Sequence, residues 1–182
     1  YDTLSGHTSG TLRGFGFGTI FAEDVTLEPG SGRTLVGWGM QNYGTQDYFG
    51  TMTLIFATRA PADLAPDPSR LFASVDLLVS SVGTVTTWIG DFPFIEAPHP
   101  RLWVMWTFGP NTLGNTSLPS IGSDGNAPSA GSTDSNIYVL QGSSSTWQTI
   151  ENERWVLRFE TVPAPGTMAA LGVAALVCIR RR

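Results

Sequence analysis

The side chains that could carry out chemistry are few in this sequence, and they are poorly placed for catalysis. The two histidines are His7, in a polar and turn-rich N-terminal stretch, and His99, which lies between two prolines. A Ser-His-Asp triad needs a histidine held in a fixed orientation, and the segment around His7 lacks a serine at the centre of a Gly-x-Ser-x-Gly turn. We therefore expect no hydrolase of that type.

Two pairs of carboxylates could in principle serve glycoside hydrolysis. They are Glu151 with Glu153 and Asp63 with Asp67. Acidic pairs that flank strands are more often solvated surface groups, and we favour that interpretation. The sequence thus predicts a protein that is not an enzyme, with a glycan-active enzyme as a third, less favoured alternative.

The sequence also gives little support for a cofactor or a metal ion. Glycine alternates with phenylalanine from Gly14 to Gly18, but a dinucleotide-binding loop must lead into a helix, and the residues that follow are typical of a strand. The segment Asp124-Gly125-Asn126 and Asp134 could offer oxygen ligands to Ca²⁺, although the spacing does not fit an EF-hand and favours a turn. The single cysteine, Cys178, lies in an apolar C-terminal run, so we expect no disulfide and no thiolate site in the preceding domain.

Six tryptophans are the remaining residues that could bind a ligand, because aromatic rings on a sheet can stack on sugars as well as fill a core. Alternation places Trp155 inside and puts Trp103 and Trp106 on opposite faces of one strand. Trp38, between two glycines, and Trp88 are the candidates for exposure and for glycan contact, although core packing is favoured even for these two.

Composition and periodicity predict that residues 1–160 form an all-β domain. The chain contains 21 Gly and 12 Pro and only 14% charged residues, which is the composition of turns and strands. Nine or ten short strands separated by frequent turns favour an antiparallel β-sandwich of jelly-roll kind. Strands are expected at 19–27, 34–41, 48–58, 71–82, 85–89, 101–108, 136–140, 147–150 and 154–160.

Some segments have a pattern that makes a more specific prediction. In 48–58, Met52, Leu54 and Phe56 share one face, as in a half-buried strand. Segment 101–108 is nearly all apolar, which predicts a central strand covered on both faces. The proline-rich segments 60–69 and 93–100, and the Gly/Ser/Asn-rich segment 111–135, are expected to be loops.

The charge of the chain excludes one class of partner. The residues before Gly166 carry seven of the ten basic residues and all 15 acidic ones, which gives a net charge of −8. Nucleic acid is therefore an unlikely partner, since its recognition needs a basic surface.

The C-terminal segment, residues 161–182, differs in composition from everything before it. Pro163, Ala164 and Pro165 precede an uncharged run from Gly166 to Ile179, and the chain closes on Arg180, Arg181 and Arg182. As a helix this run would rise roughly 21 Å, short of the ~30 Å hydrocarbon core of a bilayer. Terminal arginines can snorkel to the interface and hold that end in the cytoplasm.

A helix buried in the protein core is the alternative for this run, but a core helix should be amphipathic, whereas this one is apolar all round. We therefore predict a short transmembrane helix, with the three arginines as its membrane stop signal. The preceding domain would then face the outside of the cell.

The order of these parts resembles the PEP-CTERM sorting signal of exopolysaccharide-producing bacteria. The resemblance covers about the last twenty residues, and Pro163, Ala164 and Pro165 correspond to a Pro-Ala-Pro variant of the kind found in planctomycete-like proteins. It implies that an exosortase-like membrane protease cuts at this motif and passes the domain to the cell surface or matrix. Export also requires a leader, which we expect to have been removed or left out of this numbering.

The sequence as a whole predicts an exported cell-surface or extracellular-matrix structural protein, transiently anchored in the inner membrane. Its parts are a β-sandwich over residues 1–160 and a sorting signal over residues 161–182. The alternative is a carbohydrate-binding module of the exopolysaccharide matrix, and neither function implies a cofactor.

Overall fold

The computed structural model describes residues 1–2, 11–13, 18–28, 32–42, 47–82, 86–113, 119, 121–124, 128, 130–134, 136–142 and 144–162. The regular elements within these ranges are strands, apart from one short 3-10 helix, η1 (Pro68–Arg70). The strands are β1 (Thr11–Arg13), β2 (Ile20–Thr26), β3 (Thr34–Asn42), β4 (Tyr48–Thr58), β5 (Leu71–Ser81), β6 (Thr86–Glu96), β7 (Arg101–Phe108), β8 (Ile121–Asp124), β9 (Asn136–Leu140), β10 (Gln148–Glu151), β11 (Arg154–Trp155) and β12 (Leu157–Val162). The all-β prediction for the domain is confirmed.

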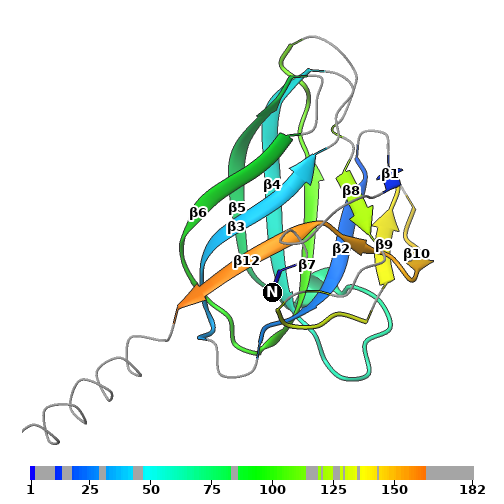
Figure 1. Cartoon of the computed structure of the whole chain (residues 1–182). Coiled ribbons are helices and arrows are strands. Elements are labelled where there is room, and N and C mark those ends of the chain that lie inside the picture. Colours follow the sequence, from blue (N-terminus) through cyan, green and yellow to red (C-terminus); the bar gives the residue numbers. More distant parts are fainter. Residues whose placement is uncertain are drawn as a thin grey trace, which may run out of the picture.

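The strands form two antiparallel sheets of six strands each. Sheet A is built on β3, which pairs with β6 on one side and with β12 and β8 on the other, while β1 and β11 pair with β8. Sheet B has the order β10-β9-β2-β7-β4-β5. Figure 1 shows β6, β3 and β12 passing in front of the layer that contains β5, β4 and β7. Two facing antiparallel sheets are consistent with the expected sandwich.

The main hydrophobic core lies between the two sheets and is lined by alternate residues of each strand. On β4, the side chains of Met52, Leu54 and Phe56 are fully buried, as their spacing predicted. Central strand β7 is flanked by β2 and β4, and its apolar residues are buried on both faces. Trp106 lies in this main core, whereas Trp103 lies on the opposite, outer face of sheet B, so the opposite-face prediction is confirmed.

A second cluster covers the outer face of sheet B. It contains Trp103 and Tyr138, whose rings meet edge to face at 5.0 Å between centroids. Both side chains are buried although they lie outside the main core. We call it the outer-face cluster; its buried apolar members are Ala22, Ala57, Trp103, Met105 and Tyr138.

Strand β12 completes sheet A and ends two residues beyond the expected domain boundary. It pairs with β3 from Leu157, opposite Met40, to Val162, opposite Thr34. On its other side, the backbone N–H of Phe159 donates to the carbonyl of Tyr1 at 2.8 Å. Trp155 is buried, as its alternation predicted, and Leu157 and Phe159 are buried as well.

Two segments that were expected to be loops contain strands, so those two predictions are wrong in part. Strand β6 continues through Pro93 to Glu96, where a proline-punctuated loop was expected. This is physically acceptable because β6 is an edge strand that pairs only with β3, and its register shifts opposite Leu35 to Gly37, so Pro93 need not donate to the ladder. Strand β8 lies within the long 111–135 segment, and its partners β1 and β11 are far away in sequence.

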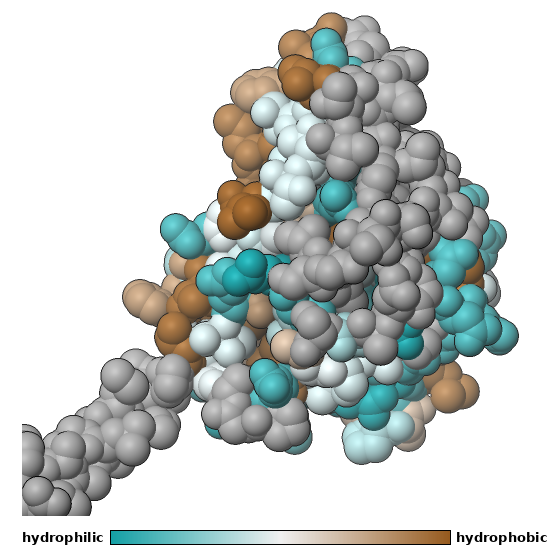
Figure 2. All heavy atoms as spheres, viewed as in Figure 1, coloured by the Kyte–Doolittle hydropathy of each residue, from teal (hydrophilic) through white to brown (hydrophobic). Residues whose placement is uncertain are grey.

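Exposed apolar residues gather on the side of the molecule formed by the two edge strands β5 and β6. Figure 2 shows them in brown along that side. Phe94 is 80% exposed, Ile89 71% and Leu78 70%. Pro93 and the register shift interrupt the free edge of β6, which limits the ability of that edge to pair with another strand.

Candidate functional site

The two tryptophans expected to contact sugars lie in the hydrophobic core. Trp38 is 6% exposed and Trp88 is 7% exposed, and the indole N–H of Trp88 donates to the carbonyl of Ser80 at 2.6 Å. Neither ring can stack on a sugar from this position. Core packing, which was favoured for both residues, is confirmed, and the alternative of glycan contact at Trp38 and Trp88 is wrong. Strand β6 turns Thr87 and Ile89 to solvent, because burying an indole removes more apolar surface from water than burying either of those side chains.

The predicted sorting residues lie outside the described residues. This applies to Pro163, Ala164 and Pro165 and to Arg180, Arg181 and Arg182, together with the apolar run between them. Within the ranges that the structure describes, no helix has the length and apolar character needed to cross a membrane.

The paired carboxylates Asp63 and Asp67 hold a loop together. The carboxylate of Asp63 accepts a hydrogen bond from the backbone N–H of Ala60 at 2.7 Å and from Nη1 of Arg70 at 2.8 Å. Asp67 caps η1, accepting from the backbone N–H of Ser69 at 2.9 Å and from its hydroxyl at 2.7 Å. These two bonds from Ser69 lower the pKa of Asp67. The pair therefore shapes the β4–β5 loop.

Asp134, one of the residues considered for Ca²⁺, already binds other side chains of the protein. Asp134 accepts a hydrogen bond from the hydroxyl of Tyr138 at 2.7 Å, and Nη2 of Arg59 lies 3.5 Å from it. Burial, followed by the bond to Asp134, raises the pKa of Tyr138 to about 12. In the described part of the chain, no group of three or more His, Cys, Asp or Glu side chains is placed to hold a metal ion.

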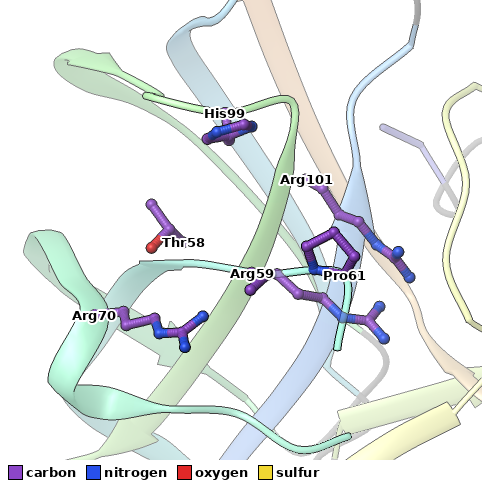
Figure 3. Close-up of a pocket in the computed structure, with 7 residues that line it drawn as sticks. Thr58, Arg59, Pro61, Arg70, His99 and Arg101 are labelled. Carbon is purple, nitrogen blue, oxygen red and sulfur yellow. The ribbon is translucent and has the colours of Figure 1, made fainter. Parts of the chain in front are cut away.

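A pocket whose lining includes three arginines and a histidine opens where the end of β4 meets the start of β7. Its volume is ≈ 340 Å³. Figure 3 shows the guanidinium groups of Arg59 and Arg101 extending in the same direction, with Arg70 and His99 on other margins of the pocket. The lining is completed by three small or apolar residues, Thr58, Ala60 and Pro61. Among the described residues, no acidic side chain belongs to the lining.

Backbone and side-chain bonds fix the two segments that form this pocket. The backbone N–H of Arg59 donates to the carbonyl of Arg101 at 3.4 Å, which ties β4 to β7. The turn that carries His99 is held by Nη1 of Arg33, which donates to the carbonyl of Pro98 at 2.8 Å. The bonds of Asp63 and Asp67 to Arg70 set the opposite margin. The basic side chains are therefore presented by a supported frame.

A buried ion-pair network lies behind the pocket, in the outer-face cluster. The Asp24 side chain is fully buried and pairs with Arg59 and, at 2.9 Å, with Nη2 of Arg101. The guanidinium of Arg59 also lies over the ring of Trp103, 4.6 Å from its centroid. Burial and the nearby charge of Arg101 both lower the pKa of Arg59. The network orients two of the three arginines.

Almost no feature of the sequence points to this pocket. In the sequence, His99 is distinguished only by its position between two prolines, and Arg101 only as the first residue of an expected strand. Arg59, Arg70 and Arg101 are separated in sequence, and only the pairing of β4 with β7 and the fold of the β4–β5 loop bring them together. Lone arginines at strand ends are common on protein surfaces, so their types alone could not have indicated a site.

Comparison with known proteins gives no further assignment: no protein-family model, no curated protein and no solved structure matches this chain.

Proposed function

We propose that this protein is a non-enzymatic structural component of the cell surface or the extracellular polysaccharide matrix, exported and sorted through its C-terminal segment. The observation that carries the proposal is the position of the sorting motif relative to the fold. Strand β12 ends at Val162, and Pro163 is the next residue. The domain thus completes its last sheet before the Pro-Ala-Pro motif begins, as a cargo domain joined to a removable signal would.

The motif itself suits cleavage at this point. Proline lacks an N–H and biases the residue before it towards extended backbone, and proteases generally bind extended chains. Gly166 to Ile179 carry no charge, and three arginines follow, so the run can pause in a bilayer with its arginines on the cytoplasmic side. An exosortase-like protease would then meet Pro163, Ala164 and Pro165 at the membrane surface.

The jelly-roll arrangement is part of this proposal. The strand order β2-β7-β4-β5 in sheet B and the order β12-β3-β6 in sheet A interleave in the way that two Greek keys do. A jelly roll places both ends of the domain in one sheet, and Tyr1 bonds to β12 in sheet A. This topology is common among lectin and capsid domains, which supports a binding or structural role more than an enzymatic one.

The intact mass of protein recovered from the surface of the native host tests sorting directly. We expect the mature form to end between Pro163 and Gly166. Replacement of Pro163 and Pro165 by alanine should retain a longer, membrane-bound form, and replacement of Arg180, Arg181 and Arg182 by glutamine should misorient the segment.

The matched control for the proline variant is Pro68→Ala with Pro98→Ala, which changes two exposed prolines in the body of the domain. This control should be processed like the wild type. Surface protein that still carries Cys178 and the terminal arginines would contradict processing and would leave the segment as a permanent anchor or a folded element.

The second candidate function, carbohydrate binding, now rests on a different place in the molecule. Trp38 and Trp88 are buried and cannot serve it. Within the described residues, the pocket between β4 and β7 is the place that best suits a ligand, because its lining combines cationic side chains with apolar surface.

A further inference from the structure

We propose that the pocket formed by Arg70, His99 and Arg101 binds a carboxylate-bearing sugar, one acidic residue of an anionic polysaccharide. This inference rests on the proposed function, because the polysaccharide matrix is the source of such a ligand. It names the ligand class and the residues that recognise it.

The size of the pocket suits one sugar unit. Its ≈ 340 Å³ volume falls at the lower end of the range for small-molecule sites, about 300–1,000 Å³. A single ring of a polysaccharide can therefore enter it, while the neighbouring units of the chain continue across the surface.

Two arginine side chains on the margins of the pocket are partly exposed. The side chain of Arg70 is 40% exposed and that of Arg101 is 39% exposed. Arg101 uses its Nε and Nη2 on Asp24, and Arg70 uses its Nη1 on Asp63 and its Nε on Asp67. A guanidinium has five N–H donors, so each retains donors for a carboxylate, which arginine binds in a bidentate manner.

The distribution of charge favours an anion in the pocket. The carboxylate that orients Arg59 and Arg101, Asp24, is fully buried behind the lining and does not reach the pocket surface. Among the described residues, the lining contains no carboxylate, so an anion that enters the pocket meets the partly exposed side chains of Arg70 and Arg101.

The remaining lining suits the rest of a sugar ring. His99 and Pro61 are exposed and offer flat ring surfaces, on which the C–H face of a sugar can pack. Thr58 adds a hydroxyl group that can donate to or accept from a sugar hydroxyl. A free inorganic anion would use the arginines but not these neutral surfaces, which separates the two kinds of ligand.

Titration calorimetry on the full chain, kept in a mild non-ionic detergent, tests the proposal with three probes. The probes are a short oligogalacturonate, the uncharged oligogalactose of the same length, and sodium sulfate. We expect the oligogalacturonate to bind with an affinity that falls as salt is added. Its affinity should exceed that of both other probes by about tenfold or more, which is the size of effect that charged hydrogen bonds provide.

Arg70→Gln is the diagnostic variant and Arg158→Gln is its matched control. Arg158 is as exposed as Arg70, at 42% for its side chain, and pairs with Glu160 on the other sheet. We expect Arg70→Gln to raise the dissociation constant about tenfold or more, and Arg158→Gln to leave it unchanged. Should Arg70→Gln fail to fold, His99→Ala, which breaks no ion pair shown here, should raise the constant about threefold or more.

Three results would overturn the proposal. They are equal affinity for the neutral oligomer, equal affinity for sulfate alone, and unchanged affinity in folded Arg70→Gln. Each would leave the intact-mass result on sorting untouched, so a failure of the ligand inference is distinguishable from a failure of the proposed function.

Discussion

Glu23 and Asp24 are neighbours in β2 whose side chains leave sheet B on opposite faces. Glu23 points into the main core, where the hydroxyl of Tyr1 and the backbone N–H of Trp155, at 2.9 Å, donate to its carboxylate. Asp24 points to the outer-face cluster and pairs with Arg59 and Arg101. Adjacent side chains of a strand point to opposite faces of the sheet. Glu23 and Asp24 therefore belong to two different polar networks.

The first prediction concerns the pH dependence of stability. Burial, partly offset by the bonds from Tyr1 and Trp155, raises the pKa of Glu23 to about 8 from an ordinary value of 4.5. Between these values the unfolded chain binds fewer protons at this site than the folded protein. The free energy of unfolding should therefore fall as pH rises from about 5 to 8, by up to about 1.4 kcal/mol per pH unit.

Urea denaturation of wild type and Glu23→Gln at pH 5, 6, 7 and 8 measures this effect. The glutamine resembles the neutral acid and should remove most of the slope. Glu151→Gln changes an exposed carboxylate on β10 and should keep the slope of the wild type. Equal slopes in the wild type and Glu23→Gln would show that Glu23 ionises normally in the folded protein.

The second prediction concerns the buried ion pair. Asp24→Asn removes the charge that faces the Arg59 side chain, which is only 7% exposed. Arg59 would keep the carboxylate of Asp134, at 3.5 Å, and the backbone carbonyl of Asp63, at 3.3 Å. Leaving a buried charge without its main partner costs about 3–5 kcal/mol, and we expect a loss of that size in urea denaturation. Asp76→Asn, on the exposed face of β5, is the control and should cost less than about 1 kcal/mol. An equally small loss of unfolding free energy in Asp24→Asn would show that Asp134 alone can neutralise the buried charge of Arg59.

At the scale of elements, the sequence located strands best where the local pattern alone decides them. The bounds of β4, β7 and β9 match the expected ranges, because alternation or flanking proline and glycine marks their ends. Strand β8 was missed because its pairing is entirely long-range. The pattern of β6 left the facing of Trp88 open because its neighbour Ile89 is also apolar, and only the packed core decides which of the two is buried.

The third prediction concerns the contact between β3 and β6. A Cβ added at Gly90 would lie 2.6 Å from Nε1 of Trp38, a buried ring that cannot move without disturbing the core. Gly90→Ala should therefore lower the free energy of unfolding by about 1–3 kcal/mol. At Gly37, by contrast, the nearest atom to an added Cβ is the end of the Glu160 side chain, at 3.3 Å.

Gly37→Ala is thus a control in the same sheet, and it should change the free energy of unfolding by less than about 1 kcal/mol, since a flexible side chain can give way. Thermal denaturation of the two variants provides the comparison. If Gly90→Ala proves as stable as Gly37→Ala, the indole of Trp38 must have room that its packing in this structure does not show.

For the whole molecule, the sequence predicted the fold class but not the pocket. Period-two hydrophobicity and frequent turns specify a β domain locally, whereas Arg70, His99 and Arg101 meet only because β4 and β7 pair and two connections converge at their ends. The buried position of Trp38 follows from the same cause, since it depends on β6 lying against β3. The residue pattern within one strand carries no information on such contacts between distant strands.

The fourth prediction concerns the boundary of the domain. A chain ending at Val162 retains all of β12 and should fold, because every described partner of β3 and β6 is kept. A chain ending at Val156 loses the buried side chains of Leu157 and Phe159 and the pairing with β3, and it should not fold cooperatively. Near-ultraviolet circular dichroism and thermal melting separate the two results, and a cooperative transition in the shorter chain would contradict the role given to β12.

The position of β12 also determines how the domain responds to mechanical force. The bonds between β12 and β3 run across the axis of β12 from Val162 to Leu157, so they lie at right angles to a pull directed along that axis. Such a pull loads these bonds in shear, so that they must break together, whereas a pull across the strand would open them one at a time. In the proposed membrane-held state of the protein, drag on the domain would therefore load the bonds between β12 and β3.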